Sequence, residues 1–131
     1  MDHKVIFIVE DEGSIRMICK RLLAQMGHAA VFAKDVQDAT QKLADMKRVD
    51  LLVTDMRLPD GDGVEVIAKL RQKFSSAKVL VITGSPVPEF RLERLYEMGF
   101  RERDVLPKPF EIGQFIAEVQ RCLEGGQCHD S

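Results

Sequence analysis

The stretch Leu51-Leu52-Val53-Thr54-Asp55-Met56-Arg57-Leu58-Pro59-Asp60-Gly61 decides the fold of this chain. It begins with apolar residues that are typical of a strand buried on both faces. It ends in Pro, Asp and Gly, which favour turns. Asp55 stands where the strand gives way to the turn. The stretch therefore predicts a buried strand that delivers a carboxylate to one edge of a sheet.

Four more short apolar runs predict the remaining strands, at residues 5–9, 29–32, 79–82 and 105–106. Segments of helical period follow each strand. The apolar positions that we expect to face the sheet from the first and last helices are Ile15, Ile18, Cys19, Leu22, Leu23 and Met26, and Ile112, Phe115, Ile116, Val119 and Leu123. Strands that alternate with helices predict an α/β fold, with a five-stranded parallel sheet and five helices on both faces.

Length and composition fit one ordinary domain. The chain has 131 residues, of which 45% are apolar and 31% charged, and a net charge of −2. We expect residues 1–124 to form the domain and residues 125–131 a polar tail. The charge is too balanced for a nucleic-acid surface. No apolar run approaches the roughly 20 residues that cross a bilayer, so a cytoplasmic location without membrane contact is expected.

Polar side chains follow the strands at their carboxyl ends. Glu10 and Asp11 follow the first strand, Asp55 the third, Thr83 the fourth and Lys108 the fifth. Ligands bind at this edge of parallel sheets, so we expect these side chains to meet. Like charges at ~4 Å repel by ~4 kcal/mol at an effective dielectric near 20, and a divalent cation with the lysine would offset that cost.

This combination of groups suits one chemistry. Oxygen ligands without His or Cys favour Mg²⁺. A cation and a lysine can neutralise phosphoryl oxygens, and an aspartate can itself be the nucleophile that forms an acyl phosphate. The edge of the sheet therefore predicts a site for phosphoryl transfer.

Four motifs carry a resemblance to a known family. They are Val9-Glu10-Asp11-Glu12, the stretch from Thr54 to Gly61, Ile82-Thr83-Gly84 and Lys108-Pro109-Phe110. Over about residues 4–124 the chain resembles the CheY-like receiver domains of two-component response regulators. The resemblance implies the flavodoxin-like, doubly wound fold with strand order 2-1-3-4-5.

The resemblance also implies the metal site. It gives Asp55 as the phosphoacceptor and Asp11 as a direct Mg²⁺ ligand. Glu10 would act through water or as a weaker ligand, and Arg57 would offer its backbone carbonyl. A sensor histidine kinase or a phosphotransfer protein would supply the phosphoryl group.

Further roles in the resemblance concern the switch. Thr83 would bond the phosphoryl group and move toward it, and Lys108 would pair with phosphoryl oxygens through a side chain placed by a cis Lys108-Pro109 bond. The family usually has an aromatic residue three positions before this lysine, where this chain has Val105. In the family this ring swings inward when the threonine moves, and a valine cannot swing a ring. The chain therefore departs from the usual readout, and rearrangement of the helix near residues 88–98 or of its preceding loop could carry the output instead.

Partners in the family bind the surface formed by the fourth helix, the fifth strand and the fifth helix. That surface makes Phe90, Arg94 and Tyr96 the interface candidates. The partner that recognises the phosphorylated form would be a downstream protein, or an output domain outside the given sequence.

The function that follows is that of a signalling phosphoacceptor rather than an enzyme, although it would catalyse its own phosphorylation and dephosphorylation. The alternative is a receiver-like scaffold that is never phosphorylated and acts by constitutive protein contact. A hydrolase of the haloacid-dehalogenase type is rejected, because that family needs an acid where this chain has Arg57.

Overall fold

The fold is a parallel sheet between two layers of helices. The computed structural model describes residues 3–84, 89–101 and 104–124, and only the backbone of residues 89–91. The main sheet has the strand order β2-β1-β3-β6-β7, with every neighbouring pair parallel. Its strands are β1 (Val5–Val9), β2 (Ala29–Ala33), β3 (Leu51–Asp55), β6 (Lys78–Thr83) and β7 (Val105–Pro107). This is the predicted 2-1-3-4-5 order, since β4 and β5 lie outside the main sheet.

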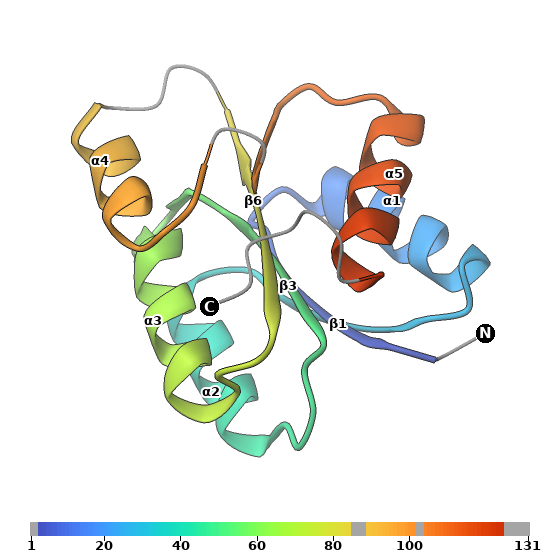
Figure 1. Cartoon of the computed structure of the whole chain (residues 1–131). Coiled ribbons are helices and arrows are strands. Elements are labelled where there is room, and N and C mark those ends of the chain that lie inside the picture. Colours follow the sequence, from blue (N-terminus) through green and yellow to red (C-terminus); the bar gives the residue numbers. More distant parts are fainter. Residues whose placement is uncertain (1–2, 85–88, 102–103, 125–131) are drawn as a thin grey trace.

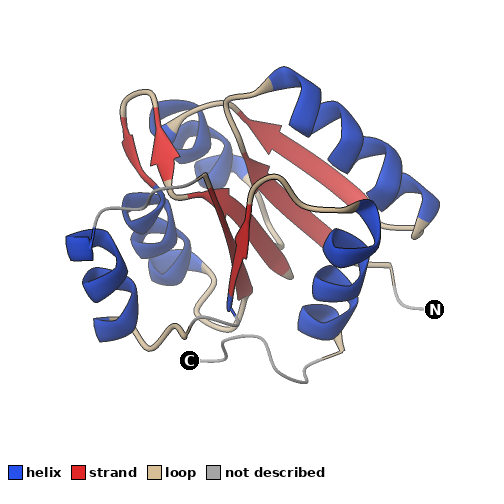
Figure 2. Ribbon diagram, turned by 90° about the horizontal axis from the view of Figure 1, so that it is seen from above, coloured by secondary structure: helices blue, strands red, loops and turns tan. Residues whose placement is uncertain are grey.

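The helices cover both faces of this sheet, as Figures 1 and 2 show. Helices α1 (Gly13–Gln25) and α5 (Ile112–Leu123) lie on one face. Helices α2 (Val36–Asp45), α3 (Gly63–Lys73) and α4 (Glu89–Glu97) lie on the other. The predicted flavodoxin-like, doubly wound architecture is therefore confirmed.

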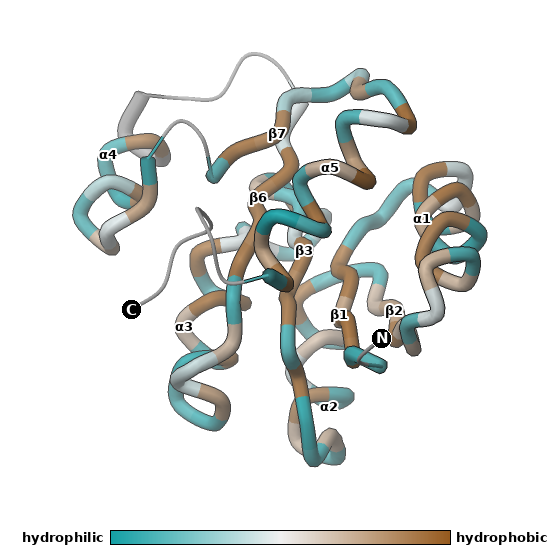
Figure 3. Tube along the Cα trace, turned by 45° about the vertical axis from the view of Figure 1, so that its right-hand side comes forward, coloured by the Kyte–Doolittle hydropathy of each residue, from teal (hydrophilic) through white to brown (hydrophobic). Residues whose placement is uncertain are grey.

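Strand side chains alternate between the two helical layers, as the pleat requires. In β1, Ile6 and Ile8 join the core under α1 and α5. Phe7 and Val9 join the core under α2, α3 and α4. Figure 3 shows the consequence in colour: the strands labelled β1, β6 and β7 are mostly hydrophobic, while the helices alternate.

Helix ends follow the local chemistry of the sequence. Asp35 accepts a hydrogen bond from the Asp38 amide at 2.7 Å and so caps α2. Asp62 accepts from the Glu65 amide at 3.3 Å and caps α3 in the same way. Gly27, just after α1, has a φ of 83°, which suits glycine at a helix end.

Two expectations about apolar faces are wrong. The helical period predicts that Ile18 and Ile112 face the sheet, but they are 44% and 57% exposed. The ring of Phe110 stacks on Phe115 with centroids 5.5 Å apart, and it covers the core beside the first turn of α5. Ile112 is therefore left on the surface, and a helical period alone could not show this.

A small antiparallel ribbon replaces part of the predicted turn after β3. It consists of β4 (Arg57–Leu58) and β5 (Gly61–Asp62), with Arg57 opposite Asp62. The predicted tail at residues 125–131 lies outside the described residues, so the domain boundary stays a prediction. In the part of the chain that the structure describes, no helix combines the length and apolarity needed to span a bilayer.

Candidate functional site

Asp55 ends the central strand and is held at the carboxyl end of the sheet. It pairs in register with Ile82 of β6, and the residue before it pairs with Val9 of β1. Only 5% of Asp55 is exposed. Its Oδ1 accepts a hydrogen bond from the Arg57 amide at 3.2 Å, which leaves Oδ2 for other partners.

Gly63 allows the following helix to approach this strand end. A Cβ at position 63 would lie 2.5 Å from the Asp55 carbonyl oxygen, which is too close for any side chain. The Gly63 amide donates to the Met56 carbonyl at 2.9 Å. Glycine at the start of α3 is therefore part of what positions Asp55.

Glu10 lies at the end of β1 and is completely buried. The Glu12 amide donates to its Oε2 at 3.0 Å. Arg16 donates from Nη1 to its backbone carbonyl at 2.7 Å, and the Glu10 amide donates to Ala33 at 2.9 Å. These contacts hold both the backbone and the carboxylate of Glu10 in place.

Lys108 brings a positive charge into the centre of the acids. Its Nζ lies 2.6 Å from Glu10 Oε1, 2.7 Å from Asp55 Oδ2 and 3.3 Å from Glu12 Oε1. Its backbone amide donates to the Thr83 carbonyl at 2.7 Å, and the Lys108-Pro109 bond is cis, as the resemblance implies. The side chain of Lys108 is only 12% exposed.

Burial and mutual contact shift the ionisation of this group of residues. Burial raises the pKa of Glu10 to about 7, against the opposing effect of the Lys108 hydrogen bond. Burial alone would lower the pKa of Lys108, but hydrogen bonds to Asp55 and Glu10 outweigh it and raise that pKa above its usual value. Lys108 is therefore a permanent cation, while Glu10 retains a proton more readily than a surface carboxyl.

The predicted metal ligands come together. Glu10, Asp11 and Asp55 each offer a carboxylate oxygen, and these oxygens lie within 4.8 Å of one another. Asp11 is exposed, whereas Glu10 and Asp55 are buried. A single lysine among two buried acids and two exposed ones leaves negative charge that a divalent cation can balance, so the donor set fits Mg²⁺.

The positions of the predicted switch residues do not test the roles predicted for them. Thr83 is 8% exposed, and its hydroxyl donates to the Gly84 carbonyl at 3.0 Å rather than to the acids. Val105 pairs in register with Val81 and packs, half-buried, against the core under α4. Arg94 and Tyr96 are exposed on α4, Tyr96 by 40%, and the side chain of Phe90 lies outside the described residues. The roles predicted for these residues remain predictions.

Two residues that sequence reasoning missed belong to this edge of the sheet. Glu12, which is 55% exposed, contacts Lys108 across 96 residues of sequence. Asp60, in the turn after Asp55, accepts from the amides of Val36 at 2.8 Å and Gln37 at 3.0 Å and so caps α2 from a distance. Both contacts depend on tertiary structure, and the sequence signals only an acid near a turn.

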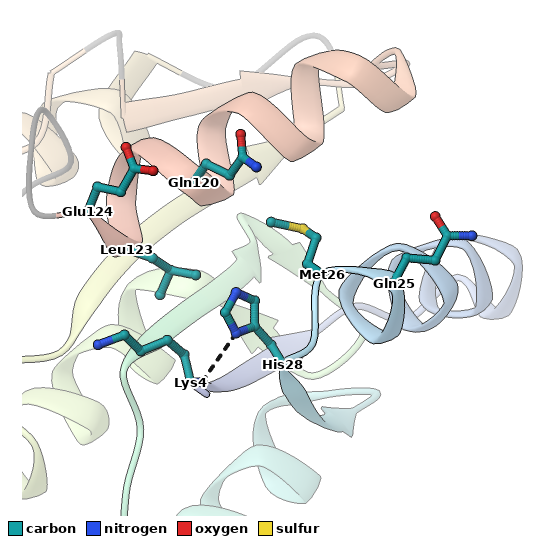
Figure 4. A pocket seen from close by; sticks show the side chains of 7 residues that line it. All are labelled: Lys4, Gln25, Met26, His28, Gln120, Leu123 and Glu124. Atoms are coloured by element: carbon teal, nitrogen blue, oxygen red, sulfur yellow. Dashed lines mark hydrogen bonds between the residues drawn. The ribbon is translucent and has the colours of Figure 1, made fainter. Parts of the chain in front are cut away.

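A largely apolar pocket of about 460 Å³ opens beside the acids, between α1 and the start of α5. Its lining residues are Glu12, Ile15, Ile18, Gly84, Lys108, Pro109, Phe110 and Ile112. A second pocket, of about 570 Å³, lies at the opposite end of the sheet and is drawn in Figure 4. It is lined by Lys4, Gln25, Met26, His28, Gln120, Leu123 and Glu124.

Comparison with known proteins agrees with this geometry. The fold and the acidic edge define a class of signalling domains that accept a phosphoryl group. Residues 6–120 match the response regulator receiver domain, and the chain belongs to that family.

The similarity to curated relatives covers most of this chain but only part of each relative. The chain is 28% identical over 123 residues to the DNA-binding transcriptional regulator NtrC of Escherichia coli (strain K12), covering 94% of this chain and 25% of that regulator. It is 30% identical to the alkaline phosphatase synthesis transcriptional regulatory protein PhoP of Bacillus subtilis (strain 168), covering 92% of this chain and 49% of that protein. The chain thus spans a quarter to a half of these curated relatives.

Among solved structures, the non-phosphorylated HemR receiver domain from Leptospira biflexa superposes with a TM-score of 0.79 at 29% identity. That superposition covers 96% of this chain and 98% of the other. The beryllofluoride-activated NtrC4 receiver domain dimer gives a TM-score of 0.77 at 26% identity, covering 92% and 97%.

Proposed function

We propose that Asp55 accepts a phosphoryl group from a sensor histidine kinase or a phosphotransfer protein, with Mg²⁺ bound beside it. The observation that carries this proposal is the geometry at the end of β3. A buried carboxylate there lies 2.7 Å from a lysine whose side chain is 12% exposed, and it shares its site with two further acids. Burying charges costs stability even when they are paired, and a cluster of this kind is typical of a functional site.

The residues that would hold the metal are Asp11, Glu10 and Asp55, with the backbone carbonyl of Arg57. Receiver domains bind Mg²⁺ at an acidic pocket. When bound, the ion supplies positive charge that stabilises phosphoryl oxygens. Two or three protein ligands suffice, because Mg²⁺ keeps several of its waters.

Asp55 acts as the nucleophile in this proposal. An oxygen of its carboxylate attacks phosphorus, the bond from phosphorus to the donor's imidazole nitrogen breaks, and the electron pair leaves with the imidazole. The Arg57 amide holds Oδ1, so the carboxylate is oriented before the reaction. Lys108, already at Oδ2, neutralises charge on the transferred group.

Thr83 and α4 carry the signal onward. The Thr83 hydroxyl leaves the Gly84 carbonyl and donates to a phosphoryl oxygen of Asp55. This movement at the end of β6 changes the surface of α4, where Arg94 and Tyr96 are exposed and Phe90 is also expected to contribute. Val105 has no ring to reorient, so the readout depends on α4.

The donor contacts the apolar pocket beside Lys108. A protein donor that reaches Asp55 must cover the surface around it. That surface carries exposed Ile18 and Ile112, with Met17 56% exposed on the same helix as Ile18. Covering such side chains contributes about 25 cal/mol per Å². The pocket therefore offers a protein donor an apolar surface beside Asp55.

The acyl phosphate is later hydrolysed at the same site, so the domain acts as a self-resetting signal in the cytoplasm rather than as an enzyme with turnover. Residues 1–124 form the phosphoacceptor domain. The lengths of NtrC and PhoP support an output domain beyond this sequence, and a separate protein target is the other arrangement.

A second candidate is the unphosphorylated scaffold, and Val105 is the observation that favours it. A valine at the usual aromatic position is compatible with a surface that never switches. The same domain would then contact its partner constitutively.

Phosphorylation of the whole chain by acetyl phosphate distinguishes these two functions. We expect a Mg²⁺-dependent phosphoryl adduct in intact-protein mass spectra of the wild type. Asp55→Asn should show none, whereas the control Asp45→Asn, at an exposed position on α2, should react normally. Absence of the adduct from the wild type with Mg²⁺ present would contradict the proposed function and leave the scaffold.

A further inference from the structure

We infer that Glu12 is an electrostatic gate for the phosphoryl donor: it occupies Lys108 in the resting protein and repels an incoming anionic donor. The inference rests on the proposed phosphoryl acceptance at Asp55 and goes beyond it, by naming a residue that sets how readily anionic donors are captured.

Glu12 stands at the start of α1 without capping it. It is the N-cap residue of α1, a position where Ser, Thr, Asp or Asn satisfies the free amides best. The Glu12 side chain makes no capping hydrogen bond at all. The Glu12 carbonyl accepts from the Arg16 amide at 3.1 Å, but the carboxylate makes no hydrogen bond to its own helix and reaches a lysine far along the chain instead. The side chain therefore has a role outside local capping.

Lys108 has its full hydrogen-bonding capacity occupied by carboxylates. An ammonium group has three N–H donors, and Lys108 has three carboxylate neighbours. Glu10 and Asp55 are at 2.6 and 2.7 Å and are buried, whereas Glu12 is at 3.3 Å and mostly exposed. A phosphoryl oxygen that approaches Lys108 displaces the weakest and most accessible of these contacts, which is Glu12.

Charge sets the direction of the effect. A small phosphoryl donor carries about two negative charges near neutral pH. Glu12 stands where that donor enters, since it lines the pocket beside Lys108. Removing one negative charge at this short range should strengthen donor capture by about fivefold, because two unit charges 4 Å apart in water interact by about 1 kcal/mol.

The test measures acetyl phosphate phosphorylation of the whole chain with saturating Mg²⁺, following the phosphoryl adduct over time. We expect Glu12→Gln to lower the apparent KM about fivefold at low salt, with the maximal rate unchanged. The difference from wild type should nearly vanish at 1 M salt, where the Debye length is about 3 Å. A role confined to the structure of α1 would not give this salt dependence.

Glu124→Gln is the matched control, because it makes the same charge change on an exposed residue at the opposite end of the sheet (Figure 4). It should react like the wild type. The inference is overturned if Glu12→Gln matches Glu124→Gln, if its maximal rate changes instead of KM, or if its advantage persists at 1 M salt. Failure of the wild type itself to react would overturn the proposed function, a separate and recognisable result.

Discussion

The two ends of the central sheet use the same residue types in different ways. At the amino end, Asp50 accepts from the Val5 amide at 2.8 Å and pairs with a half-exposed Arg48 at 2.9 Å. At the carboxyl end, buried Glu10 and Asp55 face each other across Lys108.

The charges of the amino end are satisfied where they stand: Asp50 is held by the Val5 amide and by Arg48. Those of the carboxyl end are crowded, and their burial holds the pKa of Glu10 near 7. The contrast is one of stability: burial of the acids at the carboxyl end costs stability and keeps a charged site in place, whereas the charges at the amino end contribute only to the fold. Three perturbations test that contrast.

The largest expected effect is the pH dependence of stability without metal. The unfolded chain releases the Glu10 proton near pH 4.5, and the folded chain near pH 7. Between these values the folded state holds a proton that the unfolded state has lost. The free energy of unfolding should therefore fall as pH rises and level off above 7, by roughly 3 kcal/mol at 1.36 kcal/mol per pKa unit.

Chemical denaturation at pH 5 and pH 8 in EDTA measures this, with Glu10→Gln as the reference that removes the titrating group. The variant should gain on the wild type as pH rises. Parallel pH profiles for the two proteins would show that the ionisation of Glu10 does not change the free energy of unfolding.

The next effect compares two glycines. Gly63→Ala places a Cβ 2.5 Å from the Asp55 carbonyl, so we expect a loss of about 2 kcal/mol and slower phosphorylation. Gly27→Ala, near the amino end, meets no atom within 4 Å but has a φ of 83°. It should cost about 1 kcal/mol and leave phosphorylation unchanged.

Denaturation midpoints and the initial rates of adduct formation report both quantities. Equal rates in the two glycine variants would mean that the approach of α3 does not position Asp55.

The smallest effect is expected at the amino end. Asp50→Ala removes the acceptor of the Val5 amide and the partner of Arg48, and should cost about 1 kcal/mol. Phosphorylation should proceed at the wild-type rate once folding is complete, as judged by circular dichroism and the same adduct assay. A large loss of phosphorylation in a folded Asp50→Ala protein would remove the distinction between the two ends.

Sequence patterns predict much of this fold, because buried parallel strands read as apolar runs and their carboxyl ends must share an edge. That reasoning is enough to bring Glu10, Asp11, Asp55 and Lys108 together. The ribbon at Arg57 and Asp62 was hidden, since two-residue strands have no period to detect.

The contacts of Glu12 and Asp60 were hidden for a different reason. Each side chain bonds to a group distant in sequence, so local propensity does not report it. The exposure of Ile112 depends on Phe110 stacking over the core, which is likewise a tertiary event.

Titration of beryllofluoride into the Mg²⁺-loaded protein, followed by amide NMR shifts, tests the central claim most directly. We predict shifts in the wild type that need Mg²⁺, surround Asp55 and Lys108, extend to α4, and vanish in Asp55→Asn. No Mg²⁺-dependent shift in the wild type, or equal shifts in Asp55→Asn, would contradict the claim that Asp55 is the phosphoacceptor.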